Sequence, residues 1–194
     1  MQRLIYGIGV NDAEYKAKTS SWVNGKTTIT WQCPIYKMWA NMLARCTPTK
    51  MHENRPTYIG CSVCDEWVYF SNFRDWVVSQ PWRGNQIDKD ILIAGNKIYS
   101  PELCVLIPQK LNGFLTDRRH GRGEWPLGVS SRGINKFQAT CSNPFTGKNE
   151  NLGSFSDPEE AHLAWRERKH QHACRYADMQ ADRRIADALR KRFA

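Results

Sequence analysis

The chain has 194 residues, of which 41% are hydrophobic and 11% aromatic, and 28 Lys and Arg against 19 Asp and Glu give it a formal net charge of +9. This apolar content excludes a disordered chain and predicts a buried core, while the shortness of every uninterrupted apolar run excludes a transmembrane helix. A basic surplus is typical of proteins that bind polyanions, because Lys and Arg displace the counterions condensed on phosphates. The alternative is a charge that serves solubility alone.

The first 33 residues predict an irregular arm, in which Asn24-Gly25 is a turn signal. Pro34 then stands where the first helical position should be, and apolar residues recur at three- and four-residue steps as far as Cys46. This spacing predicts an amphipathic helix. An exposed loop is expected over residues 47–57, followed by a second helix over residues 65–78.

The second helix carries a stripe of Trp and Phe side chains that we expect to pack in the core. After it, the segment from Gln86 to Ile93 alternates well enough to be a strand, and a turn and a further apolar segment follow. Asn112-Gly113 closes this part of the chain.

A stretch rich in charge and glycine predicts a linker up to residue 125. Beyond it the apolar period changes, and three short strands are expected over residues 127–132, 136–141 and 150–155. Asp157, Pro158 and Glu160 form a complete helix start, with a cap, a proline at the first position and an acid three residues after the cap. A long helix should begin there, and a basic helix should end the chain.

Seven cysteines, an odd number, and an N-terminus without the apolar segment of a signal peptide argue against a disulfide framework. Only Cys61 and Cys64 have the close spacing of zinc ligands, and a zinc site would need Cys46, Cys104 or a histidine to complete it. Buried free thiols are therefore favoured over structural zinc. We expect a soluble, intracellular protein with no membrane partner.

The three strands and the helix after them share sequence motifs with a known family. These motifs are Gly128-Val129, Lys136-Phe137-Gln138-Ala139, Leu152-Gly153-Ser154-Phe155, and Asp157 to Ala161 with Ala164-Trp165. Residues 125–175 thereby resemble the AP2 (ERF-like) DNA-binding domain. The resemblance implies a three-stranded antiparallel sheet packed on a helix, with the other face of the sheet in the major groove of double-stranded DNA.

The outward-facing strand residues would contact bases and phosphates. Placed on this sequence, the DNA-binding positions are Ser130, Arg132, Lys136, Gln138, Thr140, Ser142, Lys148, Asn149 and Asn151. The alternative is a small packing module that makes no contact with nucleic acid.

AP2 modules also occur fused to phage and homing HNH endonucleases, and residues 86–112 resemble a degenerate HNH site. The resemblance implies a ββα domain with added helices and catalytic positions at Asp88, Lys89, Asp90 and Asn112. Asp88, Asp90 and Asn112 would bind one divalent ion, Mg²⁺ or Mn²⁺, at the scissile phosphate.

Lys89 stands at the position of the general base, which is a histidine in the family. Lysine is a poor base at neutral pH, and His52 and His120 are the histidines that would have to substitute for it. The alternative for Asp88-Lys89-Asp90 is a surface ion cluster at the end of a strand.

The sequence thus predicts an α+β protein with an HNH-like domain over residues 1–112, a linker over 113–125, an AP2-like domain over 126–177 and a basic helix over 178–194. The predicted function is that of a phage-type DNA-binding protein in the cytoplasm of the host cell. It would be either an HNH-type metal-dependent endonuclease or a relative that kept the fold and lost the chemistry. A structural or interaction protein of a phage particle is a third reading.

Overall fold

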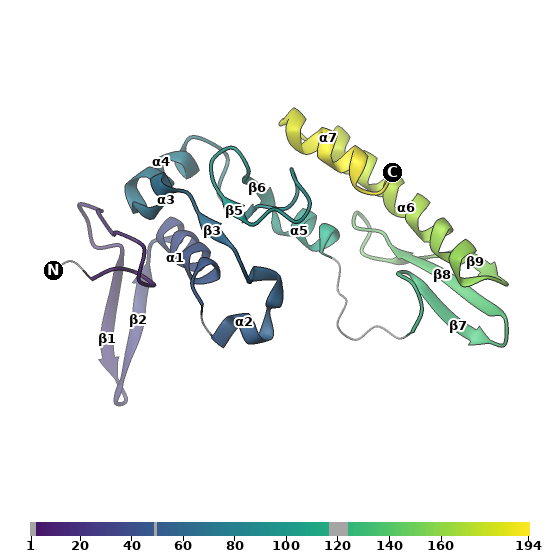
Figure 1. The fold of residues 1–194 in the computed structure, drawn as a ribbon, viewed down its shortest axis with the longest axis horizontal. Helices are drawn as coiled ribbons and strands as arrows, with labels where there is room; N and C mark the ends of the chain where they lie inside the picture. The colour runs from purple at the N-terminus through teal and green to yellow at the C-terminus, as the bar shows by residue number, and fades with distance from the viewer. Residues whose placement is uncertain (1–2, 49, 117–123) are drawn as a thin grey trace. The chain divides into compact units, whose positions relative to one another are not determined.

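The computed structural model describes residues 3–48, 50–116 and 124–194 (Figure 1). The chain has a mixed α and β fold with several small sheets, and it divides into two compact units, Met1–Gln109 and Lys110–Ala194. In the described part of the chain, no helix combines the length and the apolar character needed to cross a membrane.

The first unit combines short helices with three two-stranded sheets. Strands β1 and β2 pair antiparallel, β3 and β5 pair parallel, and β4 and β6 pair antiparallel. Its elements are β1 (Lys18–Val23), β2 (Lys26–Gln32), α1 (Pro34–Cys46), α2 (Lys50–Asn54), the 3-10 helix η1 (Pro56–Tyr58), β3 (Ser62–Val63), α3 (Asp65–Val68), α4 (Phe70–Val78), β4 (Asn85–Asp88), β5 (Ile98–Tyr99) and β6 (Val105–Pro108).

The core of the first unit lies where α1 meets α3 and α4. Helix α1 begins at Pro34, as its sequence predicts, and buries Trp39 completely. The Trp39 indole Nε1 donates a hydrogen bond of 2.7 Å to the carbonyl oxygen of Trp67, which fixes α1 to α3. Phe70 and Phe73 of α4 are also fully buried and contact these tryptophans with their rings. The expected aromatic stripe is therefore core packing.

The helix expected over residues 65–78 is interrupted at Tyr69, which has extended backbone angles. A neighbouring segment causes the break, because Val10 forms a parallel bridge with Tyr69. The Val10 N–H donates to the Val68 carbonyl at 2.9 Å, and the Phe70 N–H donates to the Val10 carbonyl at 3.0 Å.

Two further segments of this unit have more regular structure than their sequence indicates. The expected irregular arm contains the hairpin β1–β2, whose turn residues Asn24 and Gly25 both have positive φ (50° and 74°). The expected loop over residues 47–57 contains α2 and the first two residues of η1.

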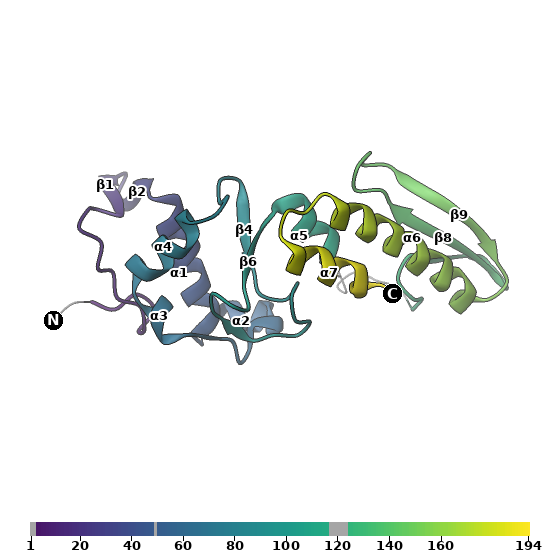
Figure 2. The same ribbon diagram turned by 90° about the horizontal axis from the view of Figure 1, so that it is seen from above.

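The second unit is a three-stranded antiparallel sheet, in the order β7-β8-β9, with helices on one face. Figure 2 shows α6 running along this sheet and α7 lying beside α6. Its elements are α5 (Gln109–Leu115), β7 (Val129–Gly133), β8 (Lys136–Ser142), β9 (Asn149–Phe155), α6 (Pro158–Asp178) and α7 (Arg183–Arg192). The three predicted strands and the long helix are all present, and the Asp157 side chain caps α6 by accepting the N–H groups of Glu159 and Glu160.

The boundary between the units lies earlier than the predicted linker over residues 113–125. Helix α5 runs through Leu115, because its Phe114 ring packs on Tyr176 and Phe193 with ring centroids 5.2 and 5.8 Å apart. Residues 117–123 of that linker lie outside the described residues. Asn112 consequently belongs to the second unit, although the sequence places it in the first. The final helix, α7, is also shorter than the expected 178–194.

Candidate nucleic-acid interface

Strand β8 divides its side chains strictly between the two faces of the second unit's sheet. Phe137, Ala139 and Cys141 are buried on the face that α6 covers. The alternate residues Lys136, Gln138, Thr140 and Ser142 point to the opposite face and are half-buried or exposed. Apolar and polar positions two residues apart produce this arrangement, because successive side chains of a strand point to opposite faces.

The neighbouring strands extend the polar face in register with β8. Ser130 of β7 lies opposite Gln138, and in β9 Asn151 lies opposite Thr140 and Asn149 lies opposite Ser142. Eight of the nine predicted DNA-binding residues therefore share one face, which we call the outer face. They are Ser130, Arg132, Lys136, Gln138, Thr140, Ser142, Asn149 and Asn151. The ninth, Lys148, is exposed in the turn just before β9.

One residue of the outer face is missing from the sequence prediction. Ser154 lies opposite Gln138, although simple alternation from Asn149 and Asn151 would place it on the core side. The register shifts between Ala139 and Thr140, and Leu152 takes up the extra position and packs against the core. A β-bulge reverses the alternation beyond it, so the pattern of β9 alone could not have identified Ser154.

The outer face carries hydrogen-bond donors and positive charge. The Arg132 Nε donates to the Gln138 Oε1 at 2.6 Å, so the guanidinium and the amide stand side by side on the face. Arg132 and Lys136 contribute two positive charges to the face, and Lys148 adds a third just before β9. Glu150, whose carboxylate is the only one in the three strands, lies opposite Cys141 and interacts with α6 instead. The face is therefore polar and basic.

Glu150 joins the sheet to α6. Its carboxylate accepts hydrogen bonds from Asn143 Nδ2 at 2.8 Å and from His172 Nε2 at 3.0 Å, and Arg168 approaches it at 3.4 Å. The hydrogen bond from Asn143, followed by the interaction with His172, holds the pKa of Glu150 below its ordinary value. These partners stabilise the ionised form of the Glu150 carboxylate. Glu150 therefore connects the sheet to α6 and does not place a negative charge on the outer face.

Gly128, just before β7, allows α6 to approach the sheet closely. It has a φ of +75°, and a Cβ atom at this position would lie 2.0 Å from Cδ1 of Trp165. The Trp165 ring is stacked on His162, whose Nδ1 is 2.9 Å from the Leu127 carbonyl oxygen. The Gly-Val and Ala-Trp motifs of the sequence therefore meet in one contact.

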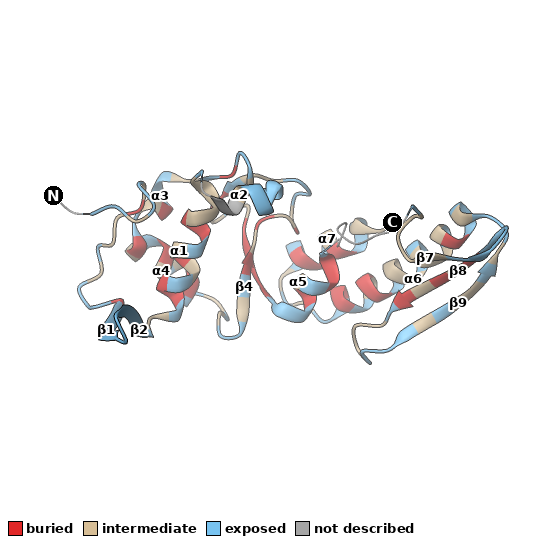
Figure 3. Ribbon diagram, turned by 90° about the horizontal axis from the view of Figure 1, so that it is seen from below, coloured by how far each residue is buried: buried red, intermediate tan, exposed pale blue. Residues whose placement is uncertain are grey.

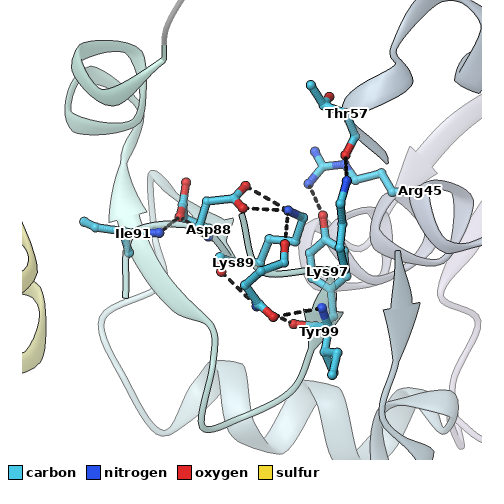
Figure 4. A network of polar contacts seen from close by, with 10 residues as sticks. Arg45, Thr57, Asp88, Lys89, Ile91, Lys97 and Tyr99 are labelled. Atoms are coloured by element: carbon cyan, nitrogen blue, oxygen red, sulfur yellow. Dashed lines mark hydrogen bonds and ion pairs between the residues drawn. The ribbon is translucent and has the colours of Figure 1, made fainter. Parts of the chain in front are cut away.

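The nuclease-like residues of the first unit lie where β4 ends, as Figure 4 shows. Asp88 Oδ1 accepts the N–H groups of Asp90 and Ile91 at 2.8 and 2.7 Å, and this turn ends the strand well before Ile93. Lys89 is buried, with 5% of its surface exposed, whereas the side chain of its partner Asp90 is 43% exposed, so the ion cluster of the alternative reading is present at the end of the strand but its lysine is buried. Its Nζ donates to both Asp90 carboxylate oxygens at 2.8 Å and to the Asn96 carbonyl at 2.5 Å.

This arrangement does not suit the implied divalent ion. An ammonium group, not a free coordination site, faces both oxygens of Asp90, and one oxygen of Asp88 is committed to the backbone of the turn. In the described ranges, no three His, Cys, Asp or Glu side chains are grouped so that they could hold a metal ion.

One of the two histidines named as replacements for the general base, His52, lies in the described part of the first unit. Nε2 of His52 lies 3.0 Å from the Arg45 carbonyl oxygen. The Arg45 side chain in turn donates a hydrogen bond from Nη1 to the Tyr99 hydroxyl at 3.4 Å (Figure 4). Lys97 Nζ donates a hydrogen bond to the Thr57 carbonyl at 2.5 Å in the same region. His120 lies outside the described residues.

The cysteines of the first unit are free thiols. Cys61 is buried and Cys64 half-buried, and Cys64 precedes α3 as its N-terminal cap residue. Burial raises the pKa of Cys46 and of Cys104 to about 12, and it raises the pKa of Cys61 and of Cys64 as well. Protonated thiols of this kind pack as small apolar groups.

Comparison of this chain with protein-family models, with curated proteins and with solved structures gives no match.

Proposed function

We propose that this protein binds double-stranded DNA through the outer face of the β7–β9 sheet. The observation that carries the proposal is the shared register of the polar side chains. Eight residues expected from the AP2 resemblance occupy one face, and the apolar side chains of β8 occupy the other. A face that lies opposite the one packed on α6 and presents Arg, Lys, Gln and Asn side chains supports contact with phosphates and base edges.

The chemistry of the face favours DNA over a neutral partner. Arg132 and Gln138 together present guanidinium and amide donors, which are the groups that read guanine and adenine edges in the major groove. Lys136 and Lys148 add charge at the ends of β8 and β9, where phosphates would flank the sheet. The combined resemblance to AP2 and HNH modules supports a phage protein that acts in the cytoplasm of the host cell, and we propose it as such.

The test is a titration of a labelled DNA duplex with the full chain, followed by fluorescence anisotropy at several salt concentrations. We expect log K to fall linearly with log salt concentration. The Arg132→Ala/Lys136→Ala double variant should bind more weakly and flatten this slope by about 1, since Lys136 is the phosphate contact of the pair and each lost phosphate contact removes about 0.9.

The control for this titration is Lys37→Ala/Lys191→Ala, which removes two exposed charges outside the sheet. It should leave the slope closer to that of the wild type. Binding that does not depend on salt, or equal losses in the two double variants, would contradict a DNA-binding role for the outer face.

Hydrolysis of DNA is the second candidate, because β4 and β6 pair antiparallel and α5 follows them, in the strand–strand–helix order that the HNH resemblance implies. The contacts of Lys89 argue against it. A general base must reach the proton that it removes, whereas the Lys89 ammonium is buried against Asp90 and the Asn96 carbonyl. We infer a DNA-binding protein in which this region has a structural role.

The nuclease alternative is tested with supercoiled plasmid incubated with Mg²⁺ or Mn²⁺. We expect no nicking above that of the Asp88→Ala variant prepared in the same way. Nicking by the wild type that Asp88→Ala abolishes would show that the first unit is a nuclease after all.

A further inference from the structure

The hairpin β1–β2 of the first unit is exposed on both faces, as the burial colours of Figure 3 show. Trp22 has 74% of its surface exposed, Ile29 54% and Trp31 49%. An isolated two-stranded hairpin is marginally stable in water, and exposed large apolar side chains in one place mark a binding surface. The hairpin is therefore a candidate for a binding element in its own right.

Each face of the hairpin carries one lysine and one tryptophan. Lys18, Ser20 and Trp22 alternate along β1 and share a face with Ile29, which lies opposite Ser20. Val23 lies opposite Lys26, and Thr19 lies opposite Trp31, on the other face. Because the register separates the residues in this way, both faces combine a cation with an aromatic ring.

Charge identifies the chemistry of the ligand. Residues 15–52 contain six Lys or Arg and no Asp or Glu. Among the residues that the structure describes, no salt bridge involves Lys16, Lys18 or Lys26. A segment that combines unneutralised lysines with exposed tryptophans attracts a polyanion and offers its rings for stacking or groove contacts.

We propose that the hairpin β1–β2 is a second DNA-binding element, which enters a groove of duplex DNA. The major groove is wide enough for a two-stranded ribbon, and its two walls are phosphate backbones. Lysines on both faces fit a ligand with two anionic walls. A lipid surface would meet only one face, and a second copy of the hairpin would bring the same positive charge. This inference rests on the proposed function in taking DNA as the ligand, but it concerns residues of the other unit.

The test uses the full chain and the same duplex titration. Lys18→Ala/Lys26→Ala should reduce the salt slope by about 2 and weaken binding about tenfold or more at low salt, because two phosphate contacts are lost. Trp22→Ala should weaken binding roughly fivefold or more without changing the slope, because it removes a contact and no charge. Lys37→Ala/Lys191→Ala is the charge-matched control, and circular dichroism of each variant establishes that it is folded.

Equal behaviour of the hairpin double variant and the control overturns the inference. If Arg132→Ala/Lys136→Ala still weakens binding in that case, the proposed function stands and only the hairpin fails. If the wild type does not bind the duplex, both fail. Two further results would also overturn the inference. In the first, Trp22→Ala impairs binding of the protein to anionic vesicles but not to the duplex. In the second, Trp22→Ala abolishes self-association of the protein but leaves duplex binding intact.

Discussion

Gly128 and Gly147 differ in what a side chain at each position would meet. Both have positive φ, +75° and +72°, but a Cβ at Gly128 would collide with Trp165, whereas at Gly147 nothing lies within 4 Å. A positive φ alone costs an L-residue about 1–2 kcal/mol, and forcing extra volume into a packed contact typically adds about 1–3 kcal/mol. The pair therefore separates backbone strain from loss of packing.

We expect Gly128→Ala to lower the free energy of unfolding of the second unit by about 3 kcal/mol or more, and Gly147→Ala by about 1 kcal/mol. Urea unfolding followed by circular dichroism measures both. Similar losses in the two variants would mean that the helix moves away from the sheet without cost, contrary to the close packing described above.

The burial of Lys89 could not be predicted from the sequence. A lysine between two aspartates has the composition of a surface ion cluster, and the sequence favours that reading as much as a catalytic one. The structure buries it because the chain turns at Asp88 and returns, so that the Asn96 carbonyl meets the ammonium. This hydrogen-bond partner of Lys89 is the backbone oxygen of Asn96, and the type of residue at position 96 does not reveal that its backbone meets the lysine.

The contact between β9 and α6 gives the second unit a dependence on pH. The pKa of Glu150 is lowered by the hydrogen bond from Asn143 and then by His172. A carboxyl whose pKa is lower in the folded state stabilises the fold above its ordinary pKa of about 4.3 and loses that contribution as the pH falls through the folded value. The strands and α6 should therefore lose stability on acidification.

We expect wild type to lose stability more steeply than Glu150→Gln between about pH 5 and pH 2, because the variant has no carboxyl to protonate there. Denaturant unfolding at each pH measures the difference. Glu167→Gln, which removes an exposed carboxyl of α6, is the control and should follow the wild type. Parallel pH profiles for wild type and Glu150→Gln would show that this contact does not couple protonation to folding.

Elements with a local signal were predictable, and those that depend on distant partners were not. Asp157 and Pro158 predict the start of α6, and the alternation of apolar and polar residues in β8 predicts which of its side chains are buried. The hairpin β1–β2 escaped prediction because both of its faces are exposed, so no apolar alternation marks its strands. The break at Tyr69 depends on Val10, about sixty residues away in sequence.

At the scale of the whole molecule, both units are basic. Residues 1–109 contain 12 Lys or Arg and 9 Asp or Glu, a net charge of +3, and residues 110–194 contain 16 and 10, a net charge of +6. Each unit has its own core and its own basic surface, the hairpin β1–β2 in the first and the outer face in the second. The net positive charge is therefore shared by both units and is not confined to one of them.

The alternation of buried and polar side chains along β8 also determines which mutations the fold tolerates. Replacing Gln138 or Thr140 alters the outer face and leaves Phe137 and Ala139 in place, so the polar face can change one residue at a time without loss of the fold. Deleting a single residue within the strand would instead exchange the two faces and expose the core. The polar positions of β8 can therefore vary, whereas its buried positions and its length are fixed by the core.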